Sequence, residues 1–165
     1  MNIWLSNIIR FVLCISLQVL LFNNLNIYGI CTPYIYILFL VSLPIELPRW
    51  AELLIGAATG LVMDVFCSSI GVHMSACILL SYLRPLLINL FVQDKERLSG
   101  DVDIDKIGLQ PYINILAILT VAHHIMMFTV ESGSASMWWL TLIRIVASSI
   151  LSFVIMIGYE LLRRR

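Results

Sequence analysis

The chain is built from apolar stretches, each about long enough to cross a lipid bilayer, joined by short polar loops. Crossing the hydrocarbon as a helix takes about 20 apolar residues. Six stretches fit this need, at residues 6–22, 33–47, 51–67, 73–92, 111–130 and 137–161. The second is short, because its residues reach only about 22 Å at ~1.5 Å per residue. It either thins the bilayer locally or continues as a bent segment.

Composition supports a membrane protein. Hydrophobic residues make up 61% of the chain, charged residues only 12%, and the mean hydropathy is +0.98. Such a chain could not stay soluble as a globule of 165 residues. We therefore expect an all-α integral membrane protein with about six transmembrane helices, in which residues 1–165 form one domain. Its surroundings are the lipid bilayer, and no nucleic-acid partner is expected.

The basic residues predict the orientation. Three loops contain no Lys or Arg, at residues 23–32, 68–72 and 131–136. The loop at residues 93–110 carries Lys95, Arg97 and Lys106, and the chain ends in three arginines. Basic residues favour the cytoplasmic side. Both termini and the 93–110 loop are therefore expected in the cytoplasm, with the first span retained as an uncleaved anchor.

A small-residue pattern stands out in the third span. Gly56, Gly60 and Asp64 recur at every fourth position, and Gly71 follows in the next loop. Residues four apart share a helix face, so the two glycines leave a groove for a close helix contact, inside the chain or with a partner. A carboxylate in a membrane helix is costly and needs a partner. Asp64 therefore belongs to a structural ion pair or hydrogen-bond network, a partner or ligand interface, or a proton or ion pathway.

Two arginines lie inside the apolar spans. Arg144 lies at about the depth of Asp64, so the two side chains could pair. Small residues at Ala147, Ser148 and Ser152 would then face the glycine groove, bringing the third and sixth spans together. Arg84 lies nearer the cytoplasmic side. There it either pairs with Glu52 or Glu160, or extends its long side chain to the interface without a partner.

No enzymatic motif is found, so we expect no catalytic residue, metal site or cofactor. Asp101, Asp103 and Asp105 imitate an EF-hand loop, but Lys106 stands where glycine is needed. His123 and His124 are adjacent and cannot both face one metal, so a packed or hydrogen-bonded pair is expected. Cys31 and Cys67 both approach the outer surface, where they either pair or stay free.

Several motifs in the first half of the chain resemble the rod shape-determining protein MreD family. They are PYIYIL at residues 33–38, Leu43-Pro44, GAATGLVMD at residues 56–64, Gly71 and Tyr82-Leu83. The resemblance implies a non-catalytic inner-membrane scaffold subunit of the bacterial cell-elongation complex. Its partners would be MreC, the MreB filament and the peptidoglycan synthases. The face of Gly56, Gly60 and Asp64 would seat the single membrane helix of MreC.

Two other classes remain. A vitamin-binding S component of an energy-coupling transporter is also a small six-helix membrane protein, and it needs an outward polar pocket. Asp64, His73 and Glu131, with Trp138 and Trp139, could form one. The first span lacks the Ala-x-x-x-Ala surface usual for S components. An ion or proton channel is the third class, but the buried charges are few and mixed in sign.

Overall fold

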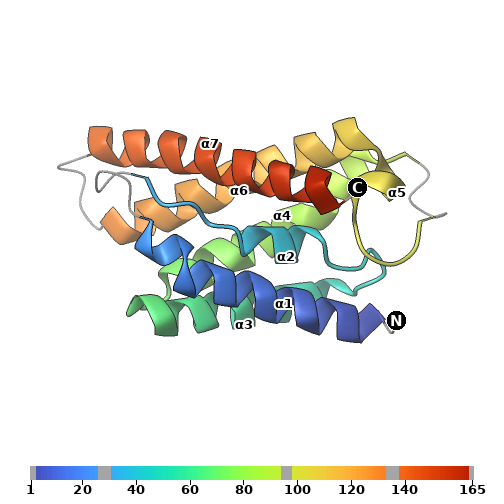
Figure 1. The fold of residues 1–165 in the computed structure, drawn as a ribbon, viewed down its shortest axis with the longest axis horizontal. Helices are drawn as coiled ribbons and strands as arrows, with labels where there is room; N and C mark the ends of the chain where they lie inside the picture. Colours follow the sequence, from blue (N-terminus) through green and yellow to red (C-terminus); the bar gives the residue numbers. More distant parts are fainter. Residues whose placement is uncertain (1–2, 26–30, 94–97, 133–137, 164–165) are drawn as a thin grey trace.

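Five long helices form the bulk of the protein. The computed structural model describes residues 3–25, 31–93, 98–132 and 138–163. The long helices are α1 (Ile3–Leu20), α3 (Arg49–Cys67), α4 (Val72–Phe91), α6 (Leu109–Ser132) and α7 (Trp138–Arg163). Each is long and apolar enough to cross a membrane. They lie along one common axis, and α1 begins at the end of the bundle where α7 finishes, here called the termini end (Figure 1).

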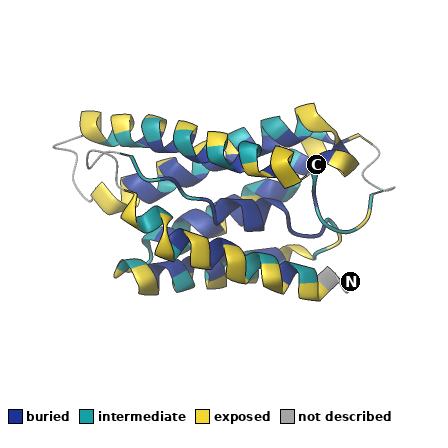
Figure 2. Ribbon diagram, viewed as in Figure 1, coloured by how far each residue is buried: buried dark blue, intermediate teal, exposed yellow. Residues whose placement is uncertain are grey.

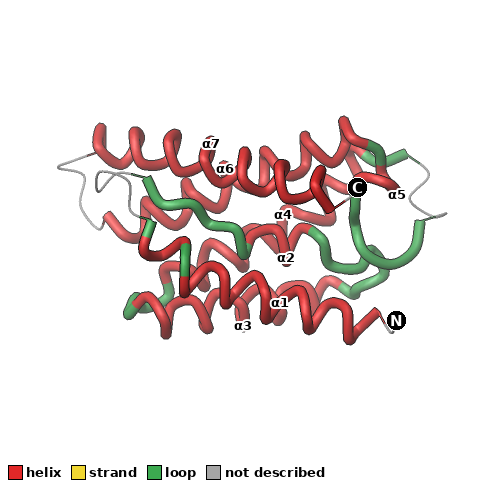
Figure 3. Tube along the Cα trace, in the orientation of Figure 1, coloured by secondary structure: helices red, strands yellow, loops and turns green. Residues whose placement is uncertain are grey.

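The second predicted span, residues 33–47, is not a transmembrane helix. Within it only α2 (Ile37–Val41) is α-helical, and the residues on both sides are irregular. Residues 31–48, here called the central segment, run through the middle of the bundle toward the termini end (Figures 1 and 3). Prolines 33, 44 and 48 lack a backbone donor and disfavour helix in the residue before them. Five helices and one irregular segment thus replace the six expected helices.

The long helices pack mainly in chain order. α3 lies against α4, α4 against α6, and α6 against α7. α1 contacts chiefly the short η1 (Phe22–Asn24) and α2. The prediction that the third and sixth spans pack together is therefore wrong, since α3 and α7 lie on opposite sides of the bundle in Figure 1.

The core of the bundle is the central segment. Tyr36, Ile37, Leu40 and Val41 are fully buried, and Figure 2 shows this segment as the most continuously buried part of the chain. The outward faces of the long helices carry large exposed apolar side chains, such as Leu20, Val65 and Ile150. Surfaces of this kind suit contact with lipid.

The loop before α6 folds back onto the termini end. Its described part contains α5 (Ile104–Ile107), which Asp103 caps by accepting a hydrogen bond from the Lys106 amide. Asp101 accepts a hydrogen bond from Asn7 at 2.8 Å and pairs with Arg10 at 3.0 Å. Asp101, one of the three aspartates of this loop, is therefore engaged in contacts with α1. Lys95 and Arg97 lie outside the described residues.

Candidate functional site: a polar core around an irregular segment

Side chains from α1 and α7 form hydrogen bonds with the backbone groups at the start of the central segment. The amide nitrogen of Gln18 donates to the Pro33 carbonyl at 3.0 Å, and its oxygen accepts from the Ile35 amide at 2.8 Å. On α7, the Ser148 hydroxyl oxygen accepts from the Thr32 amide at 3.2 Å. Ser152 does the same for the Tyr34 amide at 2.9 Å.

A buried arginine, Arg84, hydrogen-bonds the backbone of the central segment nearer the termini end. Arg84 is only 1% exposed. Its Nε donates to the Val41 carbonyl at 3.0 Å and one Nη donates to the Leu43 carbonyl. The other Nη pairs with Glu52, which is also buried. Of the two acids expected for Arg84, Glu52 is therefore the partner, while Glu160 pairs with Arg163 at 2.6 Å.

These contacts explain how irregular backbone is accommodated inside an apolar bundle. Every backbone N–H and C=O withdrawn from water needs a partner, and outside a helix the chain does not supply one locally. Gln18, Ser148, Ser152 and Arg84 supply partners from three different helices. The role of Gln18 is not among the predictions from the sequence, although a glutamine inside an apolar span was the available signal.

Replacing Gln18 by leucine should destabilise the protein by about 2 kcal/mol or more, because a buried carbonyl and a buried amide lose their partner. The matched control is Gln110→Leu, since Gln110 is exposed and donates a hydrogen bond to Asn114 on its own helix. Thermal unfolding in detergent compares the two. Equal melting temperatures for both variants would show that Gln18 does not hold the central segment.

A tyrosine and histidine cluster completes the core between the central segment, α4 and α6. The Tyr36 hydroxyl lies 2.9 Å from His73 Nδ1 and 2.7 Å from His123 Nε2. With a single proton, this hydroxyl donates to one imidazole and accepts from the other. His124 Nδ1 donates to the Thr120 carbonyl at 2.7 Å, so its Nε2 accepts from Ser152 at 3.3 Å. His123 and His124 are therefore a packed pair, as expected, and each is hydrogen-bonded to other residues.

Asp64 caps the start of α4. Its Oδ1 accepts from the Ser69 hydroxyl at 2.6 Å and the His73 amide at 2.9 Å, and Oδ2 accepts from the Met74 amide at 3.1 Å. The first amides of a helix have no partner within it, and a carboxylate there also meets the positive end of the helix dipole. Asp64 therefore belongs to a hydrogen-bond network. Arg144, its expected ion-pair partner, lies on α7, which packs against α6.

Asp64→Leu should lower stability by about 1–3 kcal/mol, because the first turn of α4 loses its cap in a buried place. Asp64→Asn should lose less, since the amide oxygen can still accept one of these hydrogen bonds. Thermal unfolding of both variants measures the difference. If leucine were as stable as wild type, the capping role would be refuted.

Gly56 and Gly60 are helix-packing residues within the chain. A Cβ at Gly60 would lie 2.6 Å from the His73 carbonyl oxygen, and one at Gly56 would lie 2.9 Å from the Cys77 carbonyl oxygen. α4 therefore fills the groove that the glycines leave. The expectation that this face seats the MreC helix is wrong for that reason. A Cβ at Gly71 would meet nothing within 4 Å, but this residue has φ +76 in the turn before α4, a conformation that favours glycine.

The outward pocket that an S component would need does not form from the expected residues. Asp64 and His73 are 3% and 4% exposed and are engaged with α4 and Tyr36. Glu131 is exposed near the end of α6, and the rings of Trp138 and Trp139 contact each other. Cys31 and Cys67 are free thiols. No group of three metal-binding side chains occurs in the part of the chain that the structure describes.

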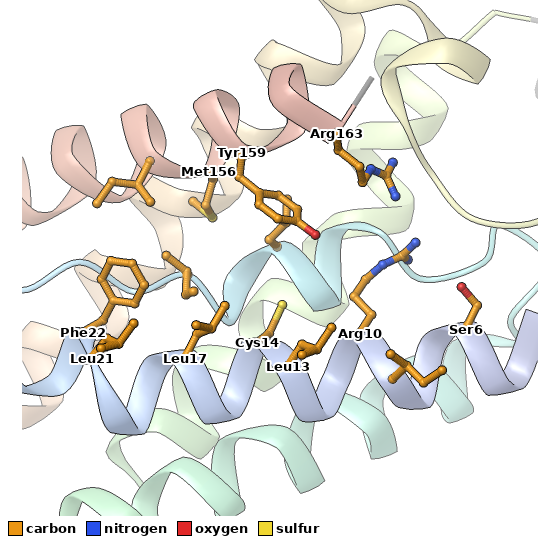
Figure 4. Close-up of a pocket in the computed structure, with 14 residues that line it drawn as sticks. Ser6, Arg10, Leu13, Cys14, Leu17, Leu21, Phe22, Met156, Tyr159 and Arg163 are labelled. Carbon is orange, nitrogen blue, oxygen red and sulfur yellow. The ribbon is translucent and has the colours of Figure 1, made fainter. Parts of the chain in front are cut away.

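A groove of about 420 Å³ separates α1 from α7. In Figure 4, side chains of both helices point toward one another across it. Leu13 and Leu17 line it from α1, Leu21 lines it just after α1, and Met156 and Tyr159 line it from α7. Ile35 and Leu38 of the central segment also line it. At the termini end it is bordered by polar side chains, namely Ser6, Arg10 and Arg163.

Comparison with protein-family models, curated proteins and solved structures gave no match. The class of protein is therefore inferred from the fold. The chain is an all-α protein with five long apolar helices, as a multi-pass membrane protein has. Its buried polar side chains hold an irregular segment at the centre of the bundle.

Proposed function

We propose that this chain is a non-catalytic membrane subunit of the bacterial cell-elongation complex, acting as a scaffold for MreC and, through it, for the MreB filament and the peptidoglycan synthases. It would lie in the inner membrane with both termini in the cytoplasm. The proposal starts from the resemblance to MreD, which is carried by Gly56, Gly60, Asp64, Gly71 and the PYIYIL run.

The observation that supports the proposal most is the structural use of those residues. The glycines allow α3 and α4 to touch, Asp64 caps α4, and the PYIYIL run lies in the buried central segment. The motif thus encodes a particular bundle, which is what a shared family fold would require. The buried ion pair of Arg84 and Glu52 likewise holds backbone in place. Such a core suits a rigid binding subunit better than a transport path.

Because α4 fills the glycine face, a partner helix must use an outward surface. Large apolar side chains are exposed on three sides, represented by Val12 on α1, Leu61 on α3 and Ile150 on α7. A single membrane-spanning helix could pack against any one of these sides without opening the bundle.

The test places a photo-crosslinking amino acid at Val12, Leu61 or Ile150 in native membranes and identifies the captured proteins by mass spectrometry. Crosslinks to MreC from one side only, with elongation synthases recovered in gentle detergent, are expected. Recovery of a coupling subunit with ATPases would contradict the proposal and assign a vitamin transporter. Capture of neither set would also contradict it, provided that the variants are folded.

A further inference from the structure

The groove between α1 and α7 is elongated. It extends from Ser6 on α1 to Leu21, just after the helix, which is about 22 Å at ~1.5 Å per residue. Its volume is about 420 Å³. A methylene chain, at carbon contact distances of about 4 Å, needs less room in such a groove than a helix about 10 Å across.

The two ends of the groove differ in chemistry. From Leu13 to Phe22 the α1 side is lined by apolar side chains and Cys14. The termini end adds Ser6, Arg10, Tyr159 and Arg163. The described residues that line the groove thus include two arginines and no carboxylate. An elongated apolar groove with guanidinium groups at one end matches a phospholipid, whose acyl chain is apolar and whose phosphate accepts hydrogen bonds from arginine.

The arginines are held in place from outside the groove. Asp101 pairs with Arg10, and Glu160 pairs with Arg163 through one Nη. One Nη of Arg10 also donates to Asn7 Oδ1 and to the Ser42 carbonyl, both at 3.3 Å. A guanidinium has five N–H donors, so donors of both arginines remain for a phosphate. The Arg163 side chain is 38% exposed, which leaves it accessible at the groove end. Positioned guanidinium groups bind phosphate through charge-assisted hydrogen bonds.

We propose that this groove binds one anionic phospholipid, with an acyl chain between α1 and α7 and the phosphate beside Arg10 and Arg163. The bound chain would fill the space between α7 and α1, which itself contacts chiefly η1 and α2. This site is independent of the proposed scaffold function, because it requires only a bilayer.

The test measures phosphatidylglycerol retained by the full chain after detergent extraction from vesicles of phosphatidylglycerol and phosphatidylcholine, using native mass spectrometry. Leu17→Trp and Leu13→Trp place an indole in the groove at positions that are 39% and 54% exposed. Arg163→Gln removes the accessible cation. We expect wild type to retain one phosphatidylglycerol, and each variant to bind it about tenfold more weakly or worse.

Matched controls separate the groove from general lipid contact. Ile150→Trp adds an indole on the outward face of α7, and Arg49→Gln removes an exposed arginine at the start of α3. Neither residue lines the groove, so both should retain the lipid as wild type does. Melting temperatures confirm that the variants are folded. Equal retention by all variants, no preference over phosphatidylcholine, or a partner protein crosslinked from Leu17 in native membranes would overturn the assignment.

Discussion

Replacing Gly60 by leucine should strongly destabilise the bundle. Even a Cβ at this position would meet backbone atoms of α4, including the His73 carbonyl oxygen. Backbone cannot move aside as the tip of a side chain can, so α3 and α4 must separate. The separation would also withdraw Asp64 from the amides that it caps. We expect a loss of more than about 3 kcal/mol, which exceeds the usual cost of overpacking.

Gly158→Leu is the matched control. Gly158 is also a glycine in a long apolar helix, but a Cβ there would meet nothing within 4 Å. The control should remain monodisperse in size-exclusion chromatography, with a melting temperature close to wild type. The Gly60 variant should aggregate or unfold at a much lower temperature. A Gly60 variant that behaves like the control would show that α4 does not lie against this face.

Replacing Arg84 by methionine is the second change with a large expected effect. It leaves Glu52 as an unpaired buried charge and removes the donors to the Val41 and Leu43 carbonyls. Breaking one half of a buried ion pair typically costs about 3–5 kcal/mol. Arg49→Met, at an exposed position, should change stability by less than about 0.5 kcal/mol. Thermal unfolding in detergent compares the two variants.

A double replacement separates the ion pair from the backbone contacts. Arg84→Met combined with Glu52→Leu removes both charges, so no buried ion is left unpaired. The double variant should be more stable than Arg84→Met alone, yet less stable than wild type, because the two carbonyls still lack donors. Full recovery of stability would mean that Arg84 serves only to neutralise Glu52, and that the central segment is held in another way.

The membrane class and the close glycine contact could be predicted because they depend on local pattern. About 20 apolar residues in a row predict a membrane helix, and five of the six predicted spans are long helices. Glycines four apart predict one smooth face on any helix. Such a pattern does not identify the helix that packs against this face. A pair between Asp64 and Arg144 would bring the sixth span to this face, whereas the next helix in the chain, α4, provides the contact.

The central segment could not be predicted by counting apolar residues. Residues 33–47 are as hydrophobic as a short membrane helix, and burial in protein needs the same apolar side chains as burial in lipid. The distinguishing signals were its prolines and the polar residues on other helices. Gln18, Ser148 and Ser152 meet the segment from positions far away in the sequence, so their role becomes visible only when the bundle is assembled.

The most direct test of the central claim is the backbone conformation of residues 31–48 in a bilayer. Solid-state NMR carbon chemical shifts of the reconstituted protein report helix residue by residue. Helical shifts are expected at Ile37–Val41, with non-helical shifts at residues 32–34 and at residues 47 and 48. Helical shifts running without a break from residue 33 to residue 47 would contradict the account, because the contacts of Gln18, Ser152 and Arg84 with this backbone could not then exist.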